Sequence, residues 1–261
     1  MWQIEDLDLD AYLQRIGHAR VEPSAESLHS LHRAHVLAIP FENIDVILGT
    51  HPGLGLDAIQ AKLVGRQRGG YCYEHTLLFG AALERLGFEV VRRVARVQPH
   101  KSGPRTHALL KVGVDGQEFL ADVGFGAGQL YPTPLKDGVV VDQGGWDHRL
   151  TLDGDVWTLS KHTADGWVPQ HASNDEPVRP IDYDVYHHYV STHPNSPFTG
   201  RPVVMRVADG VVRRLVGDKL TVEYADGRMT ERVVPATELP DVLAGLDVVL
   251  SDEEVDRLRH V

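Results

Sequence analysis

The chain contains one cysteine, Cys72, in the segment RQRGGYCYEHT between Arg66 and Thr76. It stands among polar and aromatic residues beside two glycines, whereas an inert cysteine usually lies in an apolar run and packs as a small hydrophobic side chain. The helical pattern EHTLLFGAALERLG follows directly, so the sulfur is expected at a helix N-terminus. Partial positive charge and free N–H groups at such a position favour a thiolate, the nucleophilic form of cysteine.

A nucleophilic thiol needs a base, and the segment THALLKVGVDGQEFLADVGFG supplies a histidine and an aspartate. Its two strand-like runs flank Asp115-Gly116, a dipeptide typical of two-residue hairpin turns. With that turn, His107 and Asp122 share one face of the hairpin as diagonal neighbours, about 7–8 Å apart at Cα. A four-residue loop gives the same pairing, whereas a three-residue loop with a bulge puts the two on opposite faces. The pattern favours nucleophilic catalysis, with the imidazole as base and the carboxylate orienting it.

Other polar residues near this segment have plainer interpretations. The chain has 15 histidines, so a histidine near an aspartate also arises by chance, and an isolated cysteine is often structural. The histidines within 187–193 show no HExxH or paired ligand spacing, so no metal site is expected. Arg68 and Glu74 are expected to form structural ion pairs that hold the loop around the cysteine. His75 is expected on the surface of the helix.

The composition limits the partners of the protein. A formal net charge of −11 argues against a broad basic surface, and so against binding to nucleic acid or to an anionic membrane. A single cysteine allows no internal disulfide, which is typical of a reducing compartment. The segment MWQIEDLDLDAYLQRIG lacks the features of a signal peptide, and no run of about 18 apolar residues could span a membrane. A cytoplasmic protein is therefore expected, and nothing in the sequence sets its oligomeric state.

The elements that must position the cysteine, histidine and aspartate fall into three stretches. Residues 1–87 show helical periodicity, with Ser24 placed to cap one helix and Gly87 to end the helix that follows the cysteine. Residues 88–198 are rich in β-branched runs with Asp-Gly turns, which is typical of a β-barrel or sandwich. Residues 199–261 return to mixed structure and close with a capping-box pattern before a short helix.

Three blocks of this sequence, RGGYCYEH, THALL and LADVGFG, closely resemble the arylamine N-acetyltransferases. That family carries an R-G-G-x-C-x-E block, a T-H strand and a D-V-G-F-G strand end in the same order. The stretches IPFENIDV and STHPNSPF are also similar, so the resemblance extends from the N-terminal helices to about Phe198.

The resemblance implies an α+β fold with a papain-like thiol-enzyme core. The implied domains are an N-terminal helical bundle over 1–87 that carries the nucleophilic cysteine, and a β-barrel middle domain over 88–198 that carries the histidine and the aspartate. The implied third domain is a C-terminal α/β lid over 199–261.

The resemblance also implies an acyltransferase. Acetyl coenzyme A would be the co-substrate, with no permanently bound cofactor, and an arylamine or arylhydrazine would receive the acetyl group by a ping-pong mechanism. By motif position, Cys72 would be the nucleophile, His107 its base and Asp122 the residue that orients the base. The family usually has Asn where this chain has Thr76, a change expected to affect local packing or rate rather than reaction type. The alternatives are a transglutaminase-like or hydrolytic thiol enzyme using the same three residues, and a small-molecule binding protein with an inert cysteine.

The segment GFGAG, directly after the aspartate, contributes Gly124, Phe125, Gly126 and Gly128. It lacks the Gly-Lys-Ser/Thr ending of a Walker loop, and the residues that follow cannot open the helix of a dinucleotide fingerprint. The resemblance suggests that it admits the pantetheine and pyrophosphate of acetyl coenzyme A past bare backbone. A flat arylamine is expected to pack against aromatic side chains. These are Phe41, Tyr71, Phe125 and Phe198.

Overall fold

The computed structural model describes residues 2–66, 68–126, 128–176 and 178–259 of the chain. Ala127 of the GFGAG segment and Gln67 of the cysteine segment lie outside the described residues. The helices and a 3₁₀ turn are η1 (Ile4–Asp6), α1 (Leu9–Ile16), α2 (Ala25–Ala38), α3 (Ile44–Ile47), α4 (Leu56–Leu63), α5 (Cys72–Leu86), α6 (Pro180–Thr192), α7 (Leu239–Ala244) and α8 (Asp252–Leu258). Within the described ranges, every helix is too short or too polar to cross a membrane.

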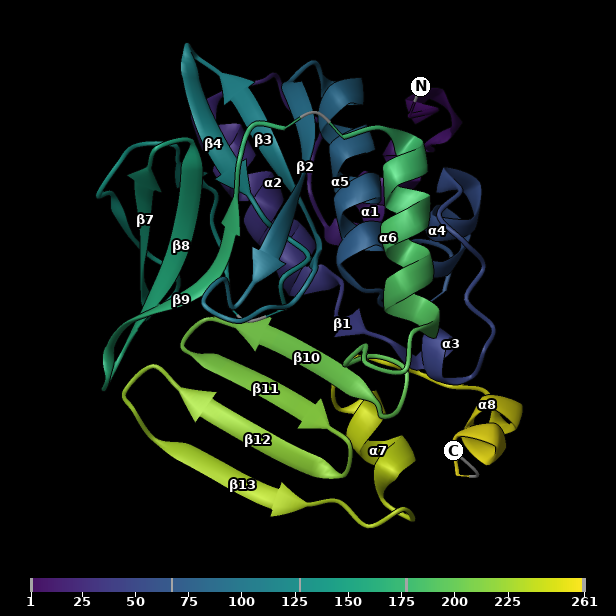
Figure 1. The fold of residues 1–261 in the computed structure, drawn as a ribbon. Helices are drawn as coiled ribbons and strands as arrows, with labels where there is room; N and C mark the ends of the chain where they lie inside the picture. Colours follow the sequence, from purple (N-terminus) through teal and green to yellow (C-terminus); the bar gives the residue numbers. More distant parts are fainter. Residues whose placement is uncertain (1, 67, 127, 177, 260–261) are drawn as a thin grey trace.

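The strands form two antiparallel sheets (Figure 1). The larger sheet is barrel-like and has the order β5-β4-β3-β2-β9-β8-β7-β6, and the smaller has the order β1-β10-β11-β12-β13. The strands of the larger sheet are β2 (Glu89–Val97), β3 (Arg105–Val114), β4 (Gln117–Ala121), β5 (Thr133–Pro134), β6 (Val140–Asp142), β7 (Asp147–Asp153), β8 (Val156–Thr163) and β9 (Gly166–Ser173). Those of the smaller sheet are β1 (Phe41–Glu42), β10 (Val203–Ala208), β11 (Val211–Val216), β12 (Lys219–Tyr224) and β13 (Met229–Val233).

The predicted fold class is confirmed: N-terminal helices, a barrel-like sheet and a C-terminal sheet with two short helices make an α+β fold. The predicted domain limits 1–87, 88–198 and 199–261 stay a prediction. Strand β1, in the first of these stretches, pairs with β10 in the third, with Phe41 opposite Met205. The C-terminal sheet is therefore joined by hydrogen bonds to the segment that leads toward the cysteine.

The hairpin of β3 and β4 has the two-residue turn that the sequence predicts. Val114 pairs with Gln117, and Asp115 and Gly116 form the turn with φ of 53° and 70°. Positive φ at both turn positions is typical of a type I′ turn, whose twist matches that of the flanking strands. The ladder continues without a bulge to the pair Leu110–Ala121, so the predicted register is correct.

Helix α5 is the central helix and is buried on almost every side. It begins at Cys72 and ends at Leu86, and the φ of 97° at Gly87 allows the left-handed C-cap. It packs on the larger sheet at Gly80, where a Cβ would be in van der Waals contact with Leu110 Cδ2 of β3, 3.4 Å away. This arrangement, with a cysteine opening a helix that packs on an antiparallel sheet, is that of the papain-like core.

A buried cluster of charges ties the N-terminal elements to the start of α5. Lys62 of α4 is 1% exposed, and its Nζ lies 2.9 Å from Glu74 Oε1 and 3.2 Å from Asp45 Oδ2. Burial alone would lower the pKa of this amine, but the surrounding carboxylates raise it above its ordinary value. The same lysine, together with His51, holds the pKa of Glu74 low against the effect of burial.

Arg68 extends the cluster along the loop that precedes Cys72. Its guanidinium lies 3.0 Å from Glu42, 2.6 Å from Asp45 and 2.7 Å from Glu254 of α8. Arg68 and Glu74 therefore belong to one buried set of ion pairs around the cysteine loop, although each pairs with other partners. An interior charge is tolerated only when it is paired and hydrogen-bonded, so these elements are held in one arrangement.

Removing the lysine of this cluster should strongly destabilise the fold. In Lys62→Met, the buried Glu74 carboxylate loses its nearest cation, and the free energy of unfolding should fall by about 3–5 kcal/mol. Urea denaturation followed by circular dichroism measures the change. As a matched control, Arg232→Met removes an exposed cation from its pair with Glu238 and should change stability by less than about 1 kcal/mol. Equal effects of the two substitutions would contradict this account of the cluster.

Candidate active site

Cys72 is the first residue of α5, where the helix presents free N–H groups. The residue before it, Tyr71, is the N-cap, and its backbone N–H donates to Glu74 Oε2 at 3.1 Å. The sulfur is 3.9 Å from the carbonyl oxygen of Thr106, the residue that precedes His107 on β3. The cysteine is 4% exposed, yet it lines a cavity. Helix α5 thus delivers the thiol to the edge of the β3–β4 hairpin.

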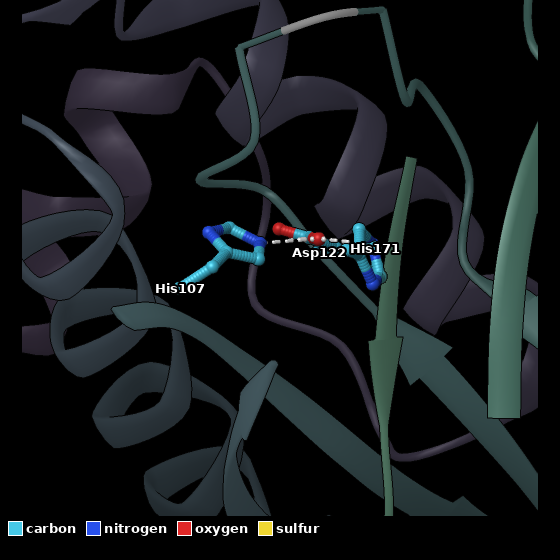
Figure 2. A group of neighbouring side chains, drawn as sticks. All are labelled: His107, Asp122 and His171. Carbon is cyan, nitrogen blue, oxygen red and sulfur yellow. Dashed lines mark hydrogen bonds and ion pairs between the residues drawn. The ribbon is translucent and has the colours of Figure 1, made fainter. Parts of the chain in front are cut away.

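His107 and Asp122 meet as the hairpin register predicts. His107 Nε2 lies 2.7 Å from Asp122 Oδ2, and both side chains are buried (Figure 2). The Cys72 side chain is close enough to the imidazole to raise its pKa. Because Nε2 is engaged by the carboxylate, Nδ1 is the nitrogen available to the thiol. Sulfur and imidazole therefore line the same cavity, and the carboxylate is bonded to the imidazole.

The surroundings of His107 favour its charged form. Burial alone would lower the pKa of the imidazole, but the Asp122 carboxylate, and then Cys72, raise it to about 10. The pKa of Asp122 is held well below its ordinary value by His107 and His171, although burial acts in the opposite direction. A protonated imidazole beside a thiol can stabilise a thiolate and can later give up its proton.

A second histidine approaches the same carboxylate. His171 of β9 is 1% exposed, and its Nε2 lies 3.1 Å from Asp122 Oδ2, opposite His107 in Figure 2. Its approach is off the line of an ideal hydrogen bond, and its Nδ1 has no partner among the described residues. Burial lowers the pKa of His171 despite the nearby carboxylate, so this imidazole is neutral at neutral pH.

These three side chains are also close enough to be considered as metal ligands. The candidate ligand atoms of His107, Asp122 and His171 lie within 4.8 Å of one another. Two ligand atoms on one tetrahedral zinc ion are about 3.3 Å apart, given bond lengths near 2.0–2.1 Å. The separation of 2.7 Å between His107 Nε2 and Asp122 Oδ2 is shorter and fits a direct hydrogen bond. The geometry therefore favours a hydrogen-bonded group over a metal centre.

The backbone of Asp122 is fixed from the helical side by His32 of α2. The N–H of Asp122 donates to His32 Nε2 at 3.1 Å, and His32 Nδ1 donates to the carbonyl of Leu130 at 3.0 Å. This pattern requires a neutral imidazole, in agreement with a pKa that burial lowers to about 4. His32 thus holds the end of β4 at the point where the aspartate leaves the strand.

Two contacts set the distance between α5 and the hairpin. Thr76 Oγ1 donates to the carbonyl of Ala108, beside His107, at 3.0 Å. Gly124 lies so close to the start of the helix that a Cβ on it would be 2.8 Å from Cys72 Cα and 3.0 Å from Cys72 O. The glycine therefore allows the strand end carrying Asp122 to reach the cysteine.

Cys72 and His107 open onto a cavity of about 470 Å³, a size typical of small-molecule sites. Its wall is mainly apolar and includes three of the aromatic residues that the sequence singles out. These are Phe41, Phe125 and Phe198. Phe125 packs its ring edge-on to His107, with ring centroids 5.1 Å apart, so the aromatic wall reaches the imidazole.

Three residues of the sequence prediction, Tyr71 for the aromatic pocket and Gly126 and Gly128 for acetyl coenzyme A, are not in the wall of this cavity. Tyr71 is completely buried and does not line it; its hydroxyl hydrogen-bonds to His187 of α6 instead. Gly126 and Gly128 line a separate, much smaller cavity and are absent from the wall of the large one. Of the described residues of the GFGAG segment, Gly124 and Phe125 line the large cavity.

The prediction that His75 lies on the helix surface is wrong. Its side chain is 1% exposed, its Nδ1 lies 2.9 Å from His35 Nε2, and its Nε2 is near the carbonyls of Pro40 and Gly70. Burial lowers its pKa to about 4, so it is a neutral link within the core. Helix α5 is covered on that side by α2, which helical periodicity alone does not reveal.

The sequence analysis did not identify two residues that contact Asp122, namely His32 and His171. His32 follows Leu28 by four positions on the buried face of α2, so its place in an apolar stripe was a usable signal. His171 had no such signal. Strand β9, which carries His171, pairs with β2 although the two strands are far apart in the sequence, as in the pair Ala95–Ser173.

Residues 24–252 match the model of a protein family described as N-acetyltransferase. An arylamine N-acetyltransferase of Mycolicibacterium smegmatis is 39% identical over 256 residues, covering 93% of each chain. The structure of Nocardia farcinica arylamine N-acetyltransferase matches with a TM-score of 0.93 and 41% identity, covering 99% of this chain and 95% of that one. Mycobacterium marinum arylamine N-acetyltransferase, solved in complex with CoA, matches with a TM-score of 0.89 and 33% identity, covering 97% and 99%.

His107 should remain protonated at neutral pH, since its pKa is raised to about 10. This exceeds the unfolded value of about 6.5, so the proton stabilises the fold fully below about pH 6.5. That contribution is lost as the pH rises through about 10. Nitrogen-15 NMR of the imidazole measures the titration, and Asp122→Asn should lower the pKa because it removes the main charge that opposes burial.

His148 is the control, because burial lowers its pKa to about 4 and it bonds to the Trp146 carbonyl, outside the site. Asp122→Asn should leave its signals unchanged. A wild-type His107 that lost its proton near pH 6.5 would sink this description of the site.

Gly124→Ala should slow the reaction of Cys72 with iodoacetamide. The new Cβ meets backbone atoms of Cys72, which cannot swing away, so the helix start and the hairpin must separate. A displacement of this kind should reduce the alkylation rate at pH 7 by about tenfold or more. Gly200→Ala is the matched control, because its Cβ meets nothing within 4 Å. Equal alkylation rates in the two variants would show that the close contact does not matter.

Proposed function

This chain belongs to the arylamine N-acetyltransferase family, and we propose that Cys72 carries an acetyl group from acetyl coenzyme A to an arylamine or arylhydrazine. The observation that carries the proposal is the shared setting of Cys72 and His107, which face one cavity of about 470 Å³ with Asp122 bonded behind the imidazole. The relative solved in complex with CoA supports acetyl coenzyme A as the co-substrate.

The first half-reaction loads the enzyme. The Cys72 sulfur attacks the thioester carbonyl carbon, and a carbon–sulfur bond forms while the carbonyl oxygen takes the negative charge. Collapse of this intermediate breaks the bond to the sulfur of coenzyme A. The proton held by His107 passes to that sulfur, so coenzyme A leaves as a thiol and the imidazole becomes neutral. Division into two steps avoids a three-body encounter and gives ping-pong kinetics.

The second half-reaction transfers the acetyl group. The amine nitrogen attacks the acetyl carbon on Cys72, and neutral His107 removes a proton from that nitrogen. Expulsion of the cysteine sulfur releases the acetylated amine and restores the starting pair. The Asp122 carboxylate keeps the imidazole in the tautomer that leaves Nδ1 facing the sulfur, and it stabilises the charge that forms on the ring.

The negative oxygen of each intermediate needs hydrogen-bond donors. We assign the backbone N–H of Cys72, which points from the start of α5, as one of them. The close approach of Gly124 to the Cys72 backbone supports this role, because it leaves no room for a side chain beside the reacting carbon. Gly124 and Phe125 are the two residues of the GFGAG segment that we retain for contact with acetyl coenzyme A.

The acceptor is proposed to be a flat aromatic ring that carries the amine. Phe41, Phe125 and Phe198 line the cavity, and aromatic side chains suit such a ring through edge-on and offset packing. The ring of Phe41 lies 5.8 Å from that of Phe198, so the two form one continuous wall. A nitrogen placed beside Phe125 would stand next to His107, which must receive its proton.

Incubation with acetyl coenzyme A in the absence of amine should yield a long-lived acetyl group on Cys72. Mass spectrometry of the intact protein and of its peptides locates the group, and addition of an arylamine should discharge it. Cys72→Ala should acquire no acetyl group and show no turnover, while its circular dichroism spectrum remains that of the wild type.

The other outcomes identify the rival functions. Rapid release of coenzyme A without amine would indicate a hydrolytic thiol enzyme, and discharge by a lysine amine would indicate a transglutaminase-like one. Neither acetylation nor release would indicate a binding protein with an inert cysteine. Substantial transfer by Cys72→Ala would remove this residue as the nucleophile.

A further inference from the structure

The loop after Asp122 folds back on itself and brings a second polar side chain to the rear of the site. Gly126 and Gly128 have φ of 74° and 96°, in the left-handed region that favours glycine. A Cβ on Gly126 would also lie 2.9 Å from Met205 Sδ and 3.0 Å from Phe41 Cγ. Gly126 and Gly128 thus allow the chain to turn so that Gln129 comes to line the same cavity as Asp122.

Asp122 and Gln129 line the same small cavity, which holds about 10 Å³ of space for a water-sized molecule. They are 2% and 4% exposed, and neither Asp122 Oδ1 nor Gln129 Nε2 has a hydrogen-bond partner among the described residues. Buried polar atoms are seldom left unpaired, and an ordered water is a common partner for them. One oxygen of the carboxylate is therefore held by histidines, while the other lacks a partner.

The rest of the cavity wall offers this pair no alternative partner among its described side chains. Most of the wall is apolar, with Val36, Ile39 and Val207 among its members. The one other polar ring is that of His75, and both of its nitrogens are engaged, by His35 and by two backbone carbonyls. The available space is about that of one water molecule, which needs roughly 10–15 Å³.

We propose that a single buried water bridges Asp122 Oδ1 and Gln129 Nε2, and that Gln129 is a positioning residue for the proposed catalytic aspartate. The water donates one hydrogen to the carboxylate oxygen and accepts the hydrogen of the amide. This bridge fixes the rotation of the carboxylate about its Cβ–Cγ bond and so keeps Oδ2 aimed at His107 Nε2. The inference rests on the proposed role of Asp122 in acetyl transfer.

The test is a double-mutant cycle measured on the first half-reaction. The rate constant for acetylation of Cys72 is followed by mass spectrometry in a single turnover with acetyl coenzyme A. Gln129→Leu keeps the approximate size of the side chain but cannot bond to water, and it should slow acetylation by about tenfold, as for a lost hydrogen bond to a charged group. In an Asp122→Ala background the same substitution should change the rate by less than about twofold, because no carboxylate remains to be positioned.

Gln143→Leu is the matched control. Gln143 is also buried, and its side chain bonds to the backbone of Tyr131 rather than to the site. Its effect on the rate should be the same in both backgrounds, as expected for a purely structural residue. If Gln129→Leu behaved like this control, or left the wild-type rate unchanged, the proposal would be overturned.

A crystal structure provides a second measurement that does not depend on the folding of the variants. The wild-type protein should show an ordered water within about 3 Å of both Asp122 Oδ1 and the Gln129 amide, and Gln129→Leu should lack it. A wild-type cavity without that water would also overturn the proposal. Failure of the proposed function looks different, because the wild-type protein would then acquire no acetyl group on Cys72. Failure of the proposed role of Asp122 would show as acetylation of Cys72 by Asp122→Ala at the wild-type rate, whatever residue 129 is.

Discussion

The site depends first on the register of one hairpin. Because side chains alternate along a strand, a shift of one residue at Asp115-Gly116 would turn His107 and Asp122 to opposite faces of the sheet. The left-handed φ of Asp115 and Gly116 closes the turn in two residues and pins the ladder from Val114–Gln117 onward. The 2.7 Å contact between imidazole and carboxylate is a consequence of that turn. The hairpin alone aligns His107 with Asp122, and the remaining elements of the site pack around these two side chains.

The second constraint is the charge state of the buried histidines. Around the site, burial keeps His32 and His75 neutral. In each ring one nitrogen donates a hydrogen bond and the other accepts one, and the partners are backbone groups or another ring. His107 differs because it alone of these three faces a carboxylate through Nε2. Its pKa therefore rises while theirs fall, although all three are buried. The fold thus uses one residue type both as a neutral support and as the proposed proton carrier.

The sequence was most informative where local chemistry decides the structure. The helix start at Cys72, the cap at Ser24 and the turn at Asp115-Gly116 are set by residues close in sequence, and all three are correct. The errors arose where distant segments decide. His75 is covered by α2, and His171 reaches Asp122 through a sheet pairing that no local pattern encodes. The place of Gly126 also depends on distant residues, because a Cβ on it would lie within 3.0 Å of Met205 and Phe41.

Thr76, which stands where the resemblance implied Asn, can be understood in the same terms. The Thr76 hydroxyl donates to the carbonyl of Ala108, so its single donor joins α5 to β3 immediately beside His107. Another side chain with a hydrogen-bond donor at the same distance from the helix axis could bond to the same carbonyl. The proposed chemistry of the thiol and the imidazole does not use this hydrogen bond. An amide would bring an additional donor and an acceptor into a setting where the threonine side chain is 1% exposed. Thr76 and Gly124 thus join helix and hairpin through two separate contacts, one to the carbonyl of Ala108 and one to the backbone of Cys72.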